Sequence, residues 1–282
     1  AASKNARHQG GAGARIALTL HEIASHEPVP AEERLLARAY GAVDVFIAHS
    51  RADSEAMHSR FGIPPERISI VPCGHFGFFA DVDDGMDARA ALGAADGGPL
   101  LLFFGSLRPY KGIKVLLDAF PAVLREVPAA RLAVVFTDER EPSEPHRARA
   151  AALGIAGRVG FYSGYRAPSE VGGIVRAADV VVLPYLRTHT SGIVHLAWAF
   201  GRPVVASAVG DLPETVVHGS TGLLVPPSDP GALAAALAAL LRDPARARAM
   251  GAAGRARDLE RGDWRAIARR TCEAYRATAT RP

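Results

Sequence analysis

The sequence has 282 residues, which is long for one domain and comfortable for two. Hydrophobic residues make up 49% of it and charged residues 22%, enough for sizeable cores, and no apolar run approaches the roughly 20 residues of a membrane-spanning helix. The net charge of +4 is concentrated after Leu241, where 11 arginines face 5 acidic residues, a pattern that favours the solvated faces of alanine-rich helices over contact with a membrane surface.

The start of the chain and its cysteines give two further expectations. Residues 1–15 are small, polar and rich in glycine, so we expect them to be poorly ordered, and we expect no signal peptide there. Cys73 and Cys272 lie far apart and outside any metal-binding spacing. This predicts a reduced, cytoplasmic setting without structural zinc.

Residues 1–80 are predicted to form a small α/β domain. Strands are expected at 15–20, 43–50 and 67–72, with helices at 31–40 and 50–60 between them. Three strands in about 70 residues cannot cover both faces of a parallel sheet. We therefore expect this domain to be incomplete, with an earlier stretch missing. Residues 73–98 are interpreted as a linker with one short helix.

Residues 81–262 are predicted to form a complete doubly wound domain, followed by a terminal helix at 263–282. Apolar runs alternate with amphipathic segments from Pro99 onward. Strands are expected at 100–105, 131–136, 158–164, 179–185, 203–207 and 221–227, and helices near 112–127, 143–154, 168–177, 191–200, 213–217, 229–242 and 244–260.

Two predicted strands end in loops with features of anion sites. The loop at 105–112 is bracketed by glycines and carries Arg108 and Lys111 just before a helix. The loop at 186–193 precedes another helix, which Thr190 or Ser191 can cap, and Gly192 lets a ligand approach the backbone. Helix N-termini attract anions. Taken singly, each loop is equally an ordinary surface loop with a plain N-cap, but two such ends together predict a cradle for a diphosphate.

The run FFGSLRPYKGIKVLLDAF, followed by SGIVHLAWAFGRPVVASAVGDLPETVVHGSTGLLVPPSDPGALAAAL, resembles the C-terminal domain of group 1 glycosyltransferases, family 4, which have the GT-B fold. The segments LTLHEIASHE and HSRADSEAMHSRFGIPPERISIVPCG resemble the second half of that family's N-terminal domain. The resemblance implies two Rossmann-like doubly wound domains, the N-terminal one truncated here, and a last helix that crosses back to the N-terminal domain.

The resemblance also implies roles for individual residues. Lys111 would bind the donor diphosphate and serve catalysis, and Arg108 would substitute for an arginine that many members carry where Ser106 stands. His21 matches a histidine that faces the donor sugar and the site of transfer. The residues implied at the phosphates and sugar are Thr190, Ser191, Gly192 and Ile193, and those at the nucleobase and ribose are Tyr165, Arg166 and Leu196.

One departure from the family affects the expected activity. Many members carry two glutamates at the positions of Thr188 and Leu196, so a carboxylate contact to the ribose is absent here. The hypothesis is a retaining glycosyltransferase that moves a sugar from a nucleoside diphosphate sugar to a hydroxyl without a metal. The alternative is a related module that binds nucleotide sugar without transfer. Phosphorylases and epimerases share the architecture, but Lys111 and Lys114 lie in the wrong setting for pyridoxal phosphate.

The expected partners follow from the same resemblance. The donor would be UDP- or GDP-linked and no cofactor is expected. The acceptor would be a glycan, a lipid or a small molecule, and nucleic acid is not expected to bind. The resemblance implies a cytoplasmic protein, with peripheral contact to the inner face of a membrane as the variant that the basic C-terminal region allows.

Overall fold

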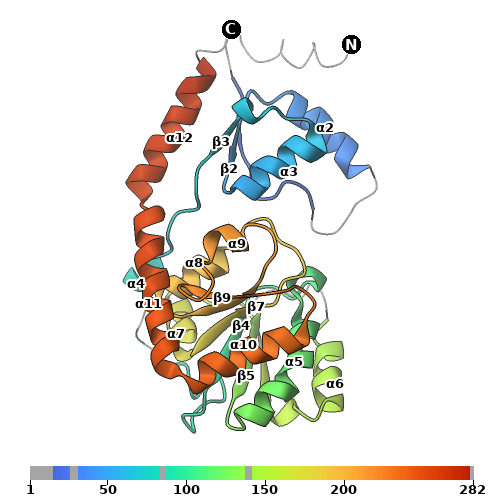
Figure 1. Ribbon diagram of the computed structural model, residues 1–282, viewed down its shortest axis with the longest axis vertical. Helices are drawn as coiled ribbons and strands as arrows, with labels where there is room; N and C mark the ends of the chain where they lie inside the picture. The colour runs from blue at the N-terminus through green and yellow to red at the C-terminus, as the bar shows by residue number, and fades with distance from the viewer. Residues whose placement is uncertain (1–14, 26–30, 83–84, 86, 137–141, 280–282) are drawn as a thin grey trace. The chain divides into compact units, whose positions relative to one another are not determined.

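The strands of the described chain belong to two separate parallel sheets, one of six strands and one of three. The computed structural model describes residues 15–25, 31–82, 85, 87–136 and 142–279, so the predicted disorder of the opening segment falls almost wholly outside it. Two compact units divide the chain (Figure 1): Ala1–Gly74 with Gly262–Pro282, and His75–Arg261. No helix of the described residues is long and apolar enough to cross a membrane.

The second unit contains the six-stranded sheet in the order β6-β5-β4-β7-β8-β9. All neighbouring strands are parallel. The strands lie close to the predicted ones because most of them are short apolar runs buried on both faces, the edge strand β6 being only half-buried. They are β4 (Leu100–Phe104), β5 (Arg131–Phe136), β6 (Val159–Ser163), β7 (Val180–Leu183), β8 (Val204–Ser207) and β9 (Gly222–Val225).

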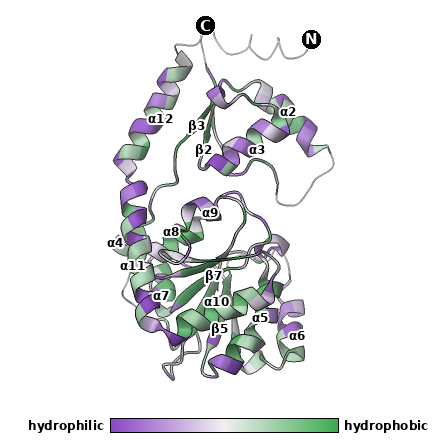
Figure 2. Ribbon diagram, in the orientation of Figure 1, coloured by the Kyte–Doolittle hydropathy of each residue, from purple (hydrophilic) through white to green (hydrophobic). Residues whose placement is uncertain are grey.

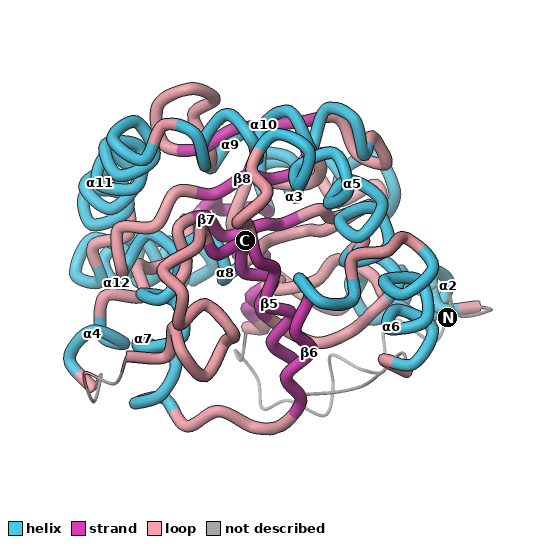
Figure 3. Tube along the Cα trace, turned by 90° about the horizontal axis from the view of Figure 1, so that it is seen from below, coloured by secondary structure: helices cyan, strands magenta, loops and turns pink. Residues whose placement is uncertain are grey.

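Alternate side chains of these strands pack against helices on opposite faces. Leu101 and Phe103 point to the core shared with α5, α6 and α10, whereas Leu100 and Leu102 point to the core shared with α7, α8 and α9. Figure 3 shows the strands as a layer with helices on either side, and Figure 2 shows that strands and inner helix faces are hydrophobic. The helices are α4 (Phe78–Asp81), α5 (Ile113–Glu126), α6 (Glu144–Ala152), α7 (Pro168–Ala177), α8 (Gly192–Ala199), α9 (Leu212–Thr215), α10 (Pro230–Arg242) and α11 (Pro244–Arg261).

The strand order determines where a ligand can bind. From β4 the chain builds outward through β5 to β6, then returns to place β7 on the other side of β4. Helices α5 and α6, which follow β4 and β5, therefore cover one face of the sheet, and helix α8, which follows β7, covers the opposite face. Ligands of doubly wound folds bind at this topological switch point, beyond the carboxyl ends of the strands.

The first unit contains the smaller sheet, in the order β1-β2-β3. Tyr40, Phe46 and Met57 form a core between this sheet and helices α2 and α3 on one face. Ile47 packs on the other face against Ala274 of α12. The observed elements are β1 (Ala17–Thr19), α2 (Glu32–Gly41), β2 (Val45–Ala48), α3 (Arg51–Phe61), β3 (Ile68–Ile70) and α12 (Trp264–Ala279).

Candidate functional site

The loops that follow β4 and β7 meet at the switch point of the large sheet. The backbone N–H of Leu186 donates to the carbonyl of Tyr110 over 2.7 Å. Gly112, with φ +68°, lies so close to the carbonyl of Pro184 that any Cβ there would collide with it. Both its backbone angle and this contact require glycine. The two segments predicted to form one cradle are thus adjacent in space.

Lys111 projects its ammonium group into this junction. Its Nζ donates to the Tyr185 hydroxyl over 3.4 Å and lies 5.0 Å from the centre of the Tyr185 ring. A Cβ built on Gly105, whose φ is +136°, would stand 3.1 Å from the same Nζ. Because the ammonium is held by a hydroxyl and a ring face without a carboxylate partner among these contacts, its charge is available to an anion.

Ser191 begins helix α8 on the opposite side of the junction. Its hydroxyl lies 3.4 Å from the Tyr185 hydroxyl, and no side chain caps the helix. Ser191 occupies the predicted N-cap position, but its hydroxyl contacts Tyr185 and makes no capping hydrogen bond. The first-turn amides of α8, including those of Gly192 and Ile193, lack a capping side chain and keep the positive end of the helix dipole toward the loop.

Gly192 lies in close contact with an aromatic ring of the protein. A Cβ at this position would approach the ring of Phe76 to 3.0 Å. The contact with Phe76 gives this glycine a role in packing, and the predicted approach of a ligand to its backbone stays a prediction. Phe76 also lies 5.9 Å from the His195 ring, measured between centroids, so it packs along the first turns of α8.

The positions of the family's two glutamates hold side chains that are turned into the protein. Thr188 is buried, and its hydroxyl donates to the carbonyl of Thr190 over 3.4 Å. Its own carbonyl excludes any Cβ at Gly210, so the loop after β7 also touches the loop after β8. Leu196, predicted at the ribose, is 4% exposed and belongs to the core under α7 and α8.

A buried hydrogen bond joins α8 to α11 next to Leu196. Nδ1 of His195 lies 2.5 Å from a carboxylate oxygen of Asp258, and both residues are buried. Close packing supports this contact, because Gly254 of α11 leaves no room for a Cβ beside Trp198 of α8. Trp198 also donates to the carbonyl of Thr221 over 3.0 Å. The sequence pattern did not identify this pair, because its members are 63 residues apart.

The remaining predicted residues of the second unit lie at the periphery of this junction. Ser106 and Arg108 belong to the loop after β4 and are half-buried. Tyr165 and Arg166 follow β6, which is separated from β4 by β5. Tyr165 is 78% exposed, while Arg166 donates to the carbonyl of Ser163 over 3.4 Å. Their proposed role in base binding stays a prediction.

His21, in the first unit, forms a pair with a second histidine that the sequence analysis did not single out. Nδ1 of His49 lies 3.0 Å from the carbonyl of Val71, and Nε2 of His49 lies 3.2 Å from Nδ1 of His21. A carbonyl only accepts, so Nδ1 of a neutral His49 carries its proton and its Nε2 accepts. His21 then donates from Nδ1, which leaves its exposed Nε2 as a proton acceptor.

Tyr185 is a residue of this junction that sequence reasoning missed. It is 2% exposed, and its hydroxyl contacts both Lys111 and Ser191. The available signal was its position: a tyrosine directly after the buried strand VVVL, where a hydroxyl would reach the edge of the sheet. Its apolar ring made it resemble the end of that strand.

Family models of glycosyltransferases match parts of both units. The sequence model of the family described as glycosyl transferases group 1 matches residues 98–243, and that of glycosyltransferase family 4 matches residues 2–75. A D-inositol 3-phosphate glycosyltransferase of Segniliparus rotundus is 34% identical over 238 residues, which are 83% of this chain and 52% of the relative. One from Kineococcus radiotolerans is 36% identical over 253 residues, 83% of this chain and 57% of the relative.

Solved structures share the fold. Sucrose-phosphate synthase of Thermosynechococcus elongatus is 28% identical with a TM-score of 0.78, over 97% of this chain and 69% of the other. HepE of Anabaena, solved with UDP-glucose, is 23% identical with a TM-score of 0.80, over 93% and 72%. These likenesses confirm the GT-B fold class, and the chain spans about half the length of the curated relatives it matches. On the match over residues 98–243, this chain belongs to the group 1 glycosyltransferase family.

Proposed function

We propose that this chain is part of a retaining glycosyltransferase that moves a sugar from a nucleoside diphosphate sugar to a hydroxyl acceptor without a metal. The observation that supports the proposal most strongly is the junction of the two loops, where Lys111 and the uncapped N-terminus of α8 converge on Tyr185. The glycosyltransferase relatives at 34% and 36% identity support the same reaction class.

The arrangement suits the charge that develops during such a transfer. Cleavage of the bond from sugar to phosphate leaves negative charge on the diphosphate and positive charge on the sugar ring. The Lys111 ammonium and the α8 dipole would stabilise the leaving diphosphate. Removing one preorganised donor of this kind from an active site costs about 2.7–4 kcal/mol. Tyr185 would hold Lys111 and Ser191 in place before the donor binds.

Donor binding tests the role of Lys111 directly. A panel of UDP- and GDP-linked sugars is added to the chain, and the dissociation constant is measured by calorimetry or thermal shift. Lys111→Ala should weaken the preferred donor at least about tenfold, since it removes a charge-assisted contact. Lys114→Ala is the matched control, because Lys114 is an exposed lysine on the first turn of α5. Equal affinity in wild type and Lys111→Ala would overturn the assignment.

Transfer is tested with acceptors that carry hydroxyl groups. D-inositol 3-phosphate, named in the relatives, is the first to try, and glycans and lipids follow. Release of nucleoside diphosphate gives the rate, and NMR of the product gives the anomeric configuration. Lys111→Ala should lower the rate at least about a hundredfold. A product of inverted configuration would contradict retention.

One observation favours a second function, a module that binds nucleotide sugar without transferring it. Leu196 stands where many members carry a glutamate, and its side chain is in the hydrophobic core. Binding and turnover measured on the same sample separate the two functions. Tight donor binding without transfer to any acceptor selects the module, whereas transfer that depends on Lys111 selects the enzyme.

A further inference from the structure

A cavity of about 220 Å³ opens at the edge of the large sheet opposite to the candidate donor site. Pro99, Asp179 and Pro203 line it, and each directly precedes a strand: β4, β7 and β8. Because all strands of this sheet are parallel, these positions share its amino-terminal edge, whereas the loops that carry Lys111 and Ser191 lie at the carboxyl edge. The cavity is therefore distinct from the candidate donor site.

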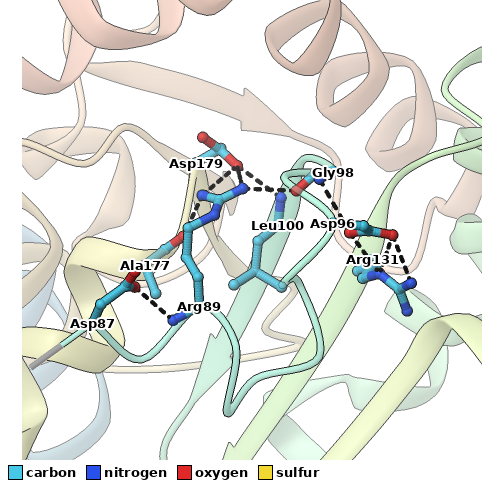
Figure 4. A network of polar contacts seen from close by, with 8 residues as sticks. All are labelled: Asp87, Arg89, Asp96, Gly98, Leu100, Arg131, Ala177 and Asp179. Carbon is cyan, nitrogen blue, oxygen red and sulfur yellow. Dashed lines mark hydrogen bonds and ion pairs between the residues drawn. The ribbon is translucent and has the colours of Figure 1, made fainter.

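Arg89 lines this cavity, and Figure 4 shows the hydrogen bonds that hold its guanidinium. Its guanidinium donates to the carbonyls of Ala177 and Gly98 over 2.8 and 2.7 Å and to the carboxylate of Asp179 over 3.3 Å. The same carboxylate oxygen accepts from the backbone N–H of Leu100 over 2.8 Å. Arg89 and Asp179 thus neutralise each other, so the pair adds no net charge to the lining of the cavity.

Arg202 contributes a second guanidinium, which has an N–H group without a hydrogen-bond acceptor among the described residues. Its Nε is buried and has no hydrogen-bond partner among the described residues. Burial lowers the pKa of Arg202. The nearby carboxylate of Asp179 raises this pKa, whereas the positive charges of Arg89 and Arg176 lower it further. An arginine remains protonated in proteins, so this positive group is partly desolvated while its Nε has no hydrogen-bond partner in the part of the chain that the structure describes. A buried donor without a partner is unfavourable, and a ligand that accepts its hydrogen bond would remove that cost.

The charge and the volume together define the class of ligand. Once Arg89 and Asp179 are paired, Arg202 and Arg248 leave two positive charges on the lining. The cavity is several times larger than the ~30 Å³ of a water molecule, yet smaller than the ~300 Å³ at which pockets for drug-sized ligands begin. A nucleotide sugar is therefore too large, whereas a small dianion fits both the space and the charge.

We propose that this cavity is a second ligand site, which binds a small phosphate-class anion such as inorganic phosphate or a short phosphate monoester. Arg202 and Arg248 would contact the phosphate oxygens, and Arg89 would form the wall that positions it. Arginine suits this role because its planar N–H groups match two phosphate oxygens at once. The site stands independently of the donor site, because the two share no residue.

Titration calorimetry with inorganic phosphate, at an ionic strength held constant with chloride, tests the proposal. The Lys111→Ala background is used so that phosphate at the candidate donor site does not contribute. Phosphate should bind in this background, and adding Arg202→Gln should abolish the binding. Arg248→Gln should weaken it at least about tenfold. Arg246→Gln is the matched control, because Arg246 is an exposed arginine of α11 outside the lining, and it should bind as its parent does.

The outcomes separate this proposal from the proposed function. No phosphate binding in Lys111→Ala, or binding unchanged by both Arg202→Gln and Arg248→Gln, would overturn the second site and leave the donor site untouched. Should Arg202→Gln fail to fold, the exposed Arg248 carries the test alone against Arg246. Donor affinity that is unchanged in Arg248→Gln, together with lost phosphate affinity, would establish two separate sites.

Discussion

The histidine pair of the first unit determines which nitrogen of His21 can act as a base. Its geometry requires a chain of two hydrogen bonds, from His21 to His49 and from His49 to the carbonyl of Val71. The three groups follow β1, β2 and β3, so they meet at the carboxyl edge of the small sheet. His49 is a positioning residue in this view: it acts through the tautomer of His21 and not on a substrate.

The tautomer of His21 is directly measurable. Nitrogen-15 NMR at a pH where both rings are neutral should show His21 protonated at Nδ1 and bare at Nε2. His49→Phe should shift His21 toward the tautomer that carries its proton on Nε2, because the acceptor for the Nδ1 proton is lost. His58→Phe is a suitable control, since that ring bonds to the carbonyl of Ile63 elsewhere in the unit. A His21 that carries its proton on Nε2 in the wild type would contradict the assignment.

At this scale the sequence singled out candidate residues but not their contacts. Lys111 and Ser191 were recognisable from a glycine-bracketed loop and a helix start. Tyr185 and His49 were not, because their role depends on partners up to 74 residues away. The same limit explains Gly192: a ring at position 76 fills the space beside it, and no local pattern records that contact.

At the scale of elements, close packing of α11 on α8 supports the helix that begins at the candidate site. Gly254 allows this approach, since a Cβ there would collide with the fully buried indole of Trp198. Gly254→Ala should therefore lower the free energy of unfolding by about 1–3 kcal/mol, the usual cost of overpacking a core. Urea unfolding of the second unit measures it. Gly157→Ala, with nothing within 4 Å of its Cβ, should leave stability equal or slightly higher; equal losses in both variants would exclude packing as the cause.

An ion pair ties the segment before β4 to the start of β5 and makes stability depend on pH. Arg131 donates to Asp96 over 2.8 Å, and hydrogen bonds from Arg131 and Gly98 lower the pKa of Asp96 from 3.8 to about 2. A carboxyl whose pKa is lowered by folding stabilises the protein above its unfolded pKa, and this contribution disappears as pH falls through the folded value.

Asp96→Asn should accordingly be less stable than the wild type above pH 3.8, and the difference should vanish as pH approaches 2. The effect is small because the pair is solvent-exposed. Urea unfolding of both proteins across this range gives the difference at each pH, so that titration of other carboxyl groups cancels. A difference in unfolding free energy that stays constant down to pH 2 would show that the substitution does not act through the charge of Asp96.

The elements of the large sheet were predictable because most of its strands are buried on both faces and appear as continuous apolar runs, LLLFF being the clearest. The strands of the small sheet were predicted too long, with 15–20 observed as Ala17–Thr19 and 43–50 as Val45–Ala48. A strand extends only as far as its neighbour pairs with it, and the lengths of the neighbours are not visible in a single run. The cavity near Arg202 was not predicted, because ligand sites were expected only at the carboxyl ends of the strands and this cavity lies at the amino-terminal edge.

At the scale of the whole molecule, the last helix belongs with the first unit although it follows the second in sequence. The small sheet has only three strands, and α2 and α3 cover one of its faces. Ile47 and Val71 on the other face are buried against Ala274 and Ile267 of α12. Trp264 at the start of this helix packs so tightly against Gly74 that a Cβ there would collide with the indole. The chain therefore closes the first unit only when its final segment folds back.

Placing a charge in this contact should unfold the first unit without the second. Ala274→Asp buries a carboxylate against Ile47 and Val71, and a buried charge without a partner costs several kcal/mol. Hydrogen exchange followed by mass spectrometry should show lost protection in β1–β3, α2 and α3, while β4–β9 stay protected. Ala268→Asp, at an exposed position of the same helix, should leave both units protected. Simultaneous loss of protection in both units would mean that they fold as one cooperative body, and full protection in both would show that α12 is not needed to complete the small sheet.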